Sequence, residues 1–171
     1  MAALELALMS PVLGMLLLGG YDLSRLIIAR AGVDKVGFSV ADVTAQYEQL
    51  TSATMAKVFM ITGSSLPTYV SGTNGVTVLT SVYLDTAANK TKIRWQCYST
   101  TATPWTSKIG SESGLSTVET DLLADGNDNV IVSEVFYRFD PIFKTFFKSG
   151  FQVYASSLFR PRLGALTVKP C

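Results

Sequence analysis

Hydrophobic residues are concentrated at the start of the chain, where residues 1–21 read MAALELALMSPVLGMLLLGGY and carry one charge, on Glu5. A helix rises about 1.5 Å per residue, so this segment is long enough to cross a hydrocarbon core of roughly 30 Å. Apolar side chains occupy all of its faces, which predicts burial in lipid or in protein. Pro11 lies in the middle of the segment and favours a kink.

The pattern then becomes amphipathic, with apolar and charged positions recurring at helical spacing. We expect this helix to end at Gly32 or Gly37, because glycine is a poor helix former and a common helix terminus. A capping pattern at Ser39 and a further short helix over 52–63 follow. The sequence therefore predicts that residues 2–62 are helical with breaks.

Beyond residue 67 the pattern changes to β-branched and aromatic runs that are separated by Gly, Asn and Asp turns. These runs predict antiparallel strands over residues 76–84, 92–98, 130–139 and 151–159. Between the second and third runs, residues 116–125 resemble one short helix that Ser116 would cap. The predicted fold is α+β: a long N-terminal hydrophobic helix packed on a small antiparallel sheet. We divide it into the apolar helix with its amphipathic extension, residues 1–37, and an α+β head, residues 38–171.

Composition narrows the possible chemistry. The 171 residues carry a net charge of +1, and no cluster of Lys or Arg follows a nucleic-acid backbone, so nucleic acid is not expected as a partner. Histidine is absent and there are two cysteines, which excludes Ser-His-Asp triads, Cys-His dyads and His/Cys metal sites. We expect no catalytic residues, no metal and no cofactor, and hence no enzyme.

Cys97 and Cys171 are far apart in sequence, on a chain that is expected to cross a membrane. This arrangement favours a disulfide formed in an oxidising compartment, and two buried free thiols are the alternative. The bond would close a loop of about 75 residues, for which chain entropy predicts roughly 4 kcal/mol of stabilisation.

The flanks of the apolar segment differ from those of a secretory signal peptide, because nothing basic precedes it and Asp22, Arg25 and Arg30 follow it. By the positive-inside rule the two arginines would place the C-terminal part in the cytoplasm, unless a basic leader once preceded Met1 and was removed. We therefore expect a processed chain, and an ordinary initiator Met1 is the alternative.

Glu5 is a candidate functional residue, since burying a carboxylate within an apolar membrane helix costs free energy. The α-ammonium of a neighbouring subunit's Met1 would lower that cost and would set the register between subunits. Alternatively, Glu5 extends to the headgroups of an ordinary single-pass anchor.

The other polar residues are interpreted mainly as surface or turn residues. Glu134 and Arg138 share a strand face, which predicts a surface ion pair. The DGNDN segment, residues 125–129, has oxygen ligands suited to Ca²⁺ but lacks an EF-hand pattern, so a turn is preferred. Arg160 and Arg162 would bind an anion or a neighbour's carboxylate, or simply form a polar segment after a strand.

Aromatic residues also stand in predicted loops. Phe146 and Phe147 are interpreted as core residues, with a contact patch as the alternative. Trp105 is expected in the core or in a lid over it, and a binding role is the alternative.

The order of these elements resembles a type IV pilin, and MAALELALMSPVLGMLLLGGYDLSRLIIAR resembles the N-terminus of the TadE-like pseudopilins of the tight-adherence (Flp) system. WQC, DNVIVSEVFYRFDPIF and FRPRLGAL look like segments that such alphaproteobacterial proteins carry near their sheet and C-terminus. Leu6 departs from the family, which usually has Phe or Tyr after the glutamate.

The resemblance implies that a prepilin peptidase leaves Met1 as the first mature residue, with a methylated amine, and Glu5 as the fifth. Glu5 would then pair with a neighbour's amine as chains leave the inner membrane, through the pilus assembly machinery, for a helical filament of identical or related pilins. The expected function is that of a structural pilin or minor pilin in an extracellular Flp-type pilus that serves surface adherence. The alternative is a single-pass envelope protein whose outer domain binds a ligand or partner.

Overall fold

The computed structural model describes residues 2–66, 68–101, 103–144 and 147–171, and for residues 2–4 it describes the backbone alone. Helix α1 (Ala2–Ala45) is followed by α2 (Ser52–Ser65) and by strands β1 (Gly75–Asp85) and β2 (Lys90–Tyr98). A single 3₁₀ turn, η1 (Thr120–Leu122), precedes β3 (Asn129–Phe139) and β4 (Phe151–Phe159). The expected α+β arrangement, a long apolar helix on a small antiparallel sheet, is confirmed.

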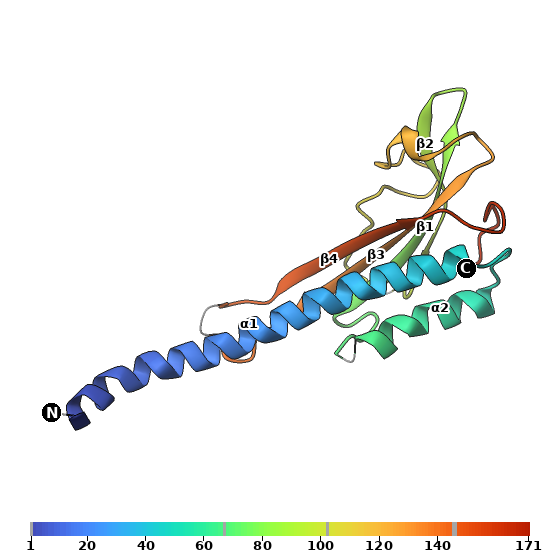
Figure 1. Ribbon diagram of the computed structural model, residues 1–171. Helices are drawn as coiled ribbons and strands as arrows, with labels where there is room; N and C mark the ends of the chain where they lie inside the picture. The colour runs from blue at the N-terminus through green and yellow to red at the C-terminus, as the bar shows by residue number, and fades with distance from the viewer. Residues whose placement is uncertain (1, 67, 102, 145–146) are drawn as a thin grey trace.

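The sheet has the order β2-β1-β3-β4, and every neighbouring pair is antiparallel. Figure 1 shows α1 and α2 on one face of this sheet, with the first half of α1 extending well beyond it. All four predicted strands are present, and the fourth has the predicted bounds. The β-branched and aromatic runs between turn residues therefore form the sheet as expected.

The main core lies between this face of the sheet and the two helices. Residues of α1 at helical spacing, Val33, Val36 and Val40, are fully buried there. They belong to the same cluster as Trp95 and Val135, on β2 and β3. The opposite face of the sheet is covered by the long connection between β2 and β3, which supplies Trp105 to a second cluster and Leu123 to a third. Trp105 thus packs over a core, as preferred from the sequence.

Helix α1 is longer than the sequence predicted. It continues through Pro11, Gly32 and Gly37 to Ala45, so the expected breaks at the two glycines are wrong. At both glycines, side chains from other parts of the chain come close to the helix backbone. A Cβ on Gly32 would come within 2.6 Å of Leu66 Cδ1, and one on Gly37 within 3.4 Å of Ser157 Oγ. Packing against the rest of the molecule outweighs the low helix propensity of these residues.

The predicted helix over 116–125 is also wrong, since its only helical part is the η1 turn. Its first residues instead lie along the edge of β2, where Leu115 bridges to Lys92 and the Ser116 amide donates to the Thr91 carbonyl over 2.9 Å. The hydroxyl of Ser116 accepts from the amide of Val118, two residues on. Backbone groups that bond to a strand in this way are not available for a helix.

Candidate assembly interface

The first half of α1 exposes apolar side chains on every face. From Glu5 to Tyr21, Gly19 is the only buried residue, because this part of the helix projects beyond the sheet (Figure 1). The large exposed side chains are Leu6, Leu8, Met9, Val12, Leu13, Met15, Leu16, Leu17, Leu18 and Tyr21. Soluble monomers rarely expose an apolar surface of this extent. This half of the helix is therefore suited to contact with lipid or with other protein chains.

By length and composition, α1 is a helix that is long and apolar enough to cross a membrane. Its second half differs from the first, because one face is buried against the sheet and α2 from Ala29 onward. The second half of α1 thus contacts the head of its own chain. The first half is exposed, apart from a few residues near Gly19 and Asp22. The change occurs near Asp22.

Glu5 lies in the first turn of α1 and is exposed. Among the described residues it has no hydrogen-bond or ion-pair partner. Met1, its expected partner from a neighbouring chain, lies outside the described residues. Pro11 lies within the helix and is exposed like its neighbours. The assembly roles of Met1, Glu5 and Pro11 stay predictions.

Asp22 is a site residue that the sequence did not single out. Its side chain is 1% exposed, and its two carboxylate oxygens accept hydrogen bonds from the backbone amides of Ile142 (2.9 Å) and Phe143 (3.0 Å). Arg25 lies 3.7 Å from the same carboxylate and reaches the Asp140 carbonyl at 3.5 Å. The connection between β3 and β4 is thereby fastened to α1 where its exposed half begins. A charged residue just after an apolar run was the available signal, but nothing local indicated its distant partner.

The aromatic residues of the same connection lie against α1. Tyr21 and Phe143 form an edge-to-face pair with ring centroids 5.7 Å apart. Phe147 is half-buried and, together with Leu16, Gly19, Gly20 and Leu23, lines a shallow groove of about 370 Å³. Phe146 lies outside the described residues. Phe147 thus falls between the two interpretations made from the sequence, since it is half-buried beside Phe151 of β4 and also borders an open apolar surface.

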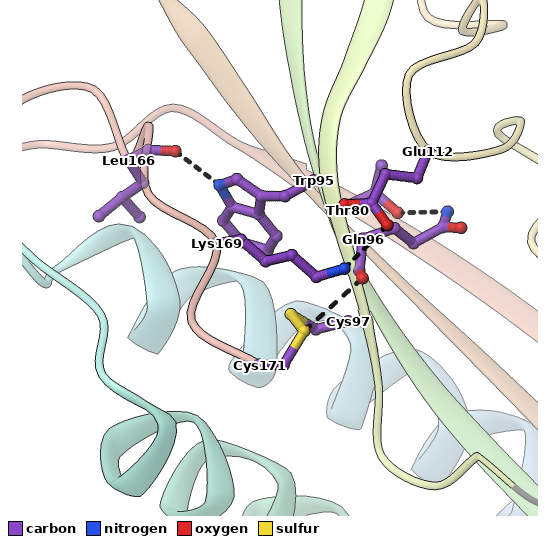
Figure 2. The surroundings of a disulfide bond; sticks show 8 residues. All are labelled: Thr80, Trp95, Gln96, Cys97, Glu112, Leu166, Lys169 and Cys171. Atoms are coloured by element: carbon purple, nitrogen blue, oxygen red, sulfur yellow. Dashed lines mark hydrogen bonds and ion pairs between the residues drawn. A yellow bond between two sulfur atoms is a disulfide. The ribbon is translucent and has the colours of Figure 1, made fainter.

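The C-terminal segment is fastened to the edge of the sheet beside β2, as Figure 2 shows. Cys97, which is fully buried, and Cys171 are joined with their Cα atoms 5.9 Å apart. The indole nitrogen of Trp95 donates to the Leu166 carbonyl over 2.8 Å, and Lys169 pairs with Glu112 at 2.8 Å. The last residues therefore close one end of the main core.

Glu134 is fully buried, so the expected surface ion pair with Arg138 is wrong. Arg138 is exposed and pairs with Asp140 instead. The alternation of β3 places Glu134 on the outer face as expected, but the β2–β3 connection covers that face. Its carboxylate accepts hydrogen bonds from the Ser107 hydroxyl, from the Lys108 amide (2.8 Å) and from the Tyr154 hydroxyl (2.9 Å).

This buried group affects its neighbour on β4. Burial, and then the negative charge of Glu134, raise the pKa of Tyr154 to about 12. The ammonium of Lys108 lies 4.0 Å from the centre of the Tyr154 ring. The cluster fixes the β2–β3 connection on the sheet.

The remaining candidates are structural. Asp125 accepts from the amides of Asn127 (2.8 Å) and Asp128 (2.9 Å), so the DGNDN segment is a turn, as preferred. Arg160 pairs with Asp128 at 3.0 Å, and Arg162 pairs with Asp42 of α1 at 2.6 Å. Both arginines thus bind carboxylates of their own chain. Within the described ranges, no three acidic or sulfur-bearing side chains gather in a group that could hold a metal ion.

Comparison with known protein families gives a match at the start of the chain. Residues 1–42 match the family described as TadE-like protein. This match lies almost entirely within α1 and does not extend to α2 or to the sheet. No curated protein and no solved structure matches the chain. The resemblance of the N-terminal segment to TadE-like pseudopilins is therefore confirmed, and it is carried by the same helix that exposes the apolar surface.

Proposed function

We propose that the protein is a pilin or minor pilin of a Flp/Tad-type pilus that serves surface adherence. Helix α1 would hold the chain in the inner membrane before assembly and would pack against the same helix of neighbouring pilins in the filament afterwards. The TadE-like match at residues 1–42 supports a pilus-associated role. The head, with the C-terminal segment fastened to its sheet, would face the periplasm and then the exterior.

One observation carries the proposal: the exposed half of α1 is apolar on all faces, yet it continues without a break into a half that is packed on the head. A helix that leaves lipid for a protein bundle exchanges one dry environment for another, so its apolar surface is satisfied in both. A rigid connection to the head would then place each head at a fixed distance from the bundle.

Glu5 would select the register in this exchange. Its carboxylate is the one charge in the first turns, and in a bundle of identical helices the α-ammonium of a neighbour's Met1 is the cation that can reach it. An unpaired carboxylate in a dry bundle is strongly disfavoured, whereas the paired state contributes little net stability. The pair would therefore act on which arrangement forms more than on how tightly it is held.

The test combines processing with assembly. Intact mass and N-terminal sequencing of the native protein are expected to give a chain that starts at Met1 with a methylated amine. Glu5→Ala is expected to lower recovery in sheared surface filaments at least about tenfold, the effect of 1.4 kcal/mol on an equilibrium. The exposed head carboxylate Glu48 provides the control, and Glu48→Ala should assemble as wild type.

The opposite results are equally clear. An unmodified N-terminus, together with a Glu5→Ala chain that enters filaments as well as wild type, would remove the pilin mechanism. The protein would then be better described as a single-pass envelope protein whose head binds a ligand or partner, with Glu5 placed at the headgroups.

A further inference from the structure

The described parts of the connection between β3 and β4 (residues 140–144 and 147–150, here called the β3–β4 connection) lie at the same level along α1 as the end of its exposed apolar half. The amides of Ile142 and Phe143 bond to Asp22, and the Phe143 ring contacts Tyr21. Phe147 borders the groove beside Leu16. Figure 1 shows the coloured parts of this connection beside the blue part of α1, at the end of the sheet that is nearest the N-terminus. The connection is therefore held against helix residues from about the sixteenth to the twenty-fifth.

This level can be compared with the thickness of a bilayer. From Glu5 to Tyr21 the helix rises about 24 Å, which is less than the roughly 30 Å of a hydrocarbon core. If Glu5 lies near one boundary of the core, the other boundary falls at or just beyond Tyr21. A segment that contacts Tyr21 and borders the groove beside Leu16 must then meet the membrane at its outer interface. This step depends on the membrane placement of α1 in the proposed function.

The exposed side chains of the connection suit such an interface. Ile142 is 56% exposed and Phe143 is 43% exposed, although both are fastened to the helix through their backbones. Lys144 and Lys148 are exposed beside them. Aromatic and aliphatic side chains at the headgroup level, with lysines among them, are typical of segments that contact anionic membranes. In water the same side chains would enlarge an already large apolar surface.

We propose that the β3–β4 connection is a second membrane-contacting element, which enters the outer interface of an anionic bilayer beside α1. Ile142, Phe143 and Phe147 reach the boundary between headgroups and acyl chains, and Lys144 and Lys148 contact headgroup phosphates. Asp22 holds the connection at this depth. The head is thereby fixed in orientation on the membrane by two elements, the helix and the connection, before it joins any assembly.

The experiment uses the full-length chain in vesicles of equal parts phosphatidylcholine and phosphatidylglycerol. Ile142→Cys is labelled with an environment-sensitive dye, and its quenching by nitroxide-labelled lipids reports contact with the bilayer. Leu13→Cys serves as the reference within the apolar half of α1, and Leu163→Cys as the reference on the far side of the head; both side chains are exposed. We expect quenching of the Ile142 label by shallow nitroxides, of the Leu13 label by deep ones, and of the Leu163 label by neither.

The other outcomes separate this inference from the proposed function. Quenching of the Leu13 label without quenching of the Ile142 label overturns the inference and leaves the membrane helix in place. Failure of both overturns the inference together with the membrane placement of α1. A blue-shifted Ile142 label that lipids do not quench means that a second copy covers the connection, which also overturns the inference.

The lysines provide an independent readout. In vesicles of phosphatidylcholine alone, we expect the shallow quenching of the Ile142 label to fall. Replacing Lys144 and Lys148 together by Gln should remove this dependence on phosphatidylglycerol. Lys57→Gln, at an exposed position on α2, should leave it intact. A double variant that keeps the full dependence would overturn the contact between these lysines and headgroup phosphates.

Discussion

The buried carboxylate of Glu134 connects three parts of the head. Its partners are the Ser107 hydroxyl and Lys108 amide of the β2–β3 connection and the Tyr154 hydroxyl of β4. Hydrogen bonds to an ionised group each contribute more than neutral ones, and a donor left unsatisfied in a buried site costs about 1–3 kcal/mol. The cluster thus fixes the outer layer of the head with a few polar contacts rather than a second large core.

Glu134→Gln should therefore lower the free energy of unfolding by about 2 kcal/mol, because the amide cannot accept from all three donors. Urea unfolding of the detergent-solubilised chain measures the change. Glu112→Gln is the matched control, since Glu112 pairs with Lys169 at the surface and should contribute under about 1 kcal/mol. Equal effects of the two substitutions would contradict this account of Glu134.

The raised pKa of Tyr154 gives a prediction about pH. Because the folded pKa of about 12 lies above the ordinary 10.0, the contribution of Tyr154 to stability is complete below pH 10 and is lost as pH rises toward 12. Ultraviolet titration of tyrosinate should show one late-titrating tyrosine that disappears in Tyr154→Phe. In Glu134→Gln its pKa should fall but stay above 10.0, since burial is the larger cause. A titration without a late component would contradict the prediction.

Asp22 provides a third prediction at the level of single residues. Asp22→Ala leaves the amides of Ile142 and Phe143 without their acceptors, so hydrogen exchange at these two amides should become about 30-fold faster, the equivalent of about 2 kcal/mol. Asp34→Ala is the control, because Asp34 forms an exposed pair with Arg30 on the same helix. Unchanged protection of the two amides in Asp22→Ala would show that ring packing alone holds the connection.

Among the elements, the strands were predictable and the helix bounds were not. Runs of β-branched and aromatic residues between turn residues specify strands locally, and the run over 151–159 is matched to the residue. Gly32 and Gly37, by contrast, suggested ends of the helix because their reason is distant: one faces Leu66 and the other faces β4. A single sequence shows the low propensity of glycine but not the close approach that offsets it.

The same limit applies to the polar elements of the site. The alternation along β3 placed Glu134 on the outer face correctly, but nothing near it in sequence indicates that residues around Ser107 cover that face. Asp22 likewise has its acceptor role set by amides 120 and 121 residues away. The exposed apolar half of α1, in contrast, was evident from residues 1–21 alone, because its function depends on composition rather than on a distant partner.

The C-terminal segment allows a test of how one end of the core is closed. Cys171→Ser removes a bond that spans 74 residues, for which chain entropy predicts a loss of about 4 kcal/mol. The wild-type chain should show no free thiol after unfolding without a reductant, and urea unfolding should report the loss in the variant. Free thiols in unreduced wild-type protein would mean that Cys97 and Cys171 are not bonded in the native protein.

At the scale of the whole molecule, the two halves of α1 have separate energetic roles. The residues of α1 that belong to the core cluster begin at Ala29, whereas the residues before Gly19 contribute exposed apolar surface. Stability of the head should thus depend on the second half, and association should depend on the first. In the proposed function, a rigid helix that continues from one region to the other would transmit the position of the membrane or filament to the head.

This division predicts that a chain beginning at Gly20 folds as a soluble monomer without detergent. It keeps Asp22 and every described core residue, and it loses the large exposed side chains from Leu6 to Leu18. Circular dichroism and size-exclusion chromatography should show a cooperative transition and a monomer. A chain beginning at Val36 is the control: it lacks Ala29 and Val33, and cavities left by such residues typically cost several kcal/mol, so it should be unfolded or strongly destabilised.

The contrary result would be informative in a specific way. If the chain beginning at Gly20 aggregates although its helix and sheet content are retained, apolar surface other than the first half of α1 must drive association, and the β3–β4 connection with Ile142 and Phe143 is the exposed candidate. Replacing both by Ser in the shortened chain should then restore a monomer. If aggregation persists with loss of structure, the first half of α1 contributes to folding itself, and the separation of roles along the helix fails.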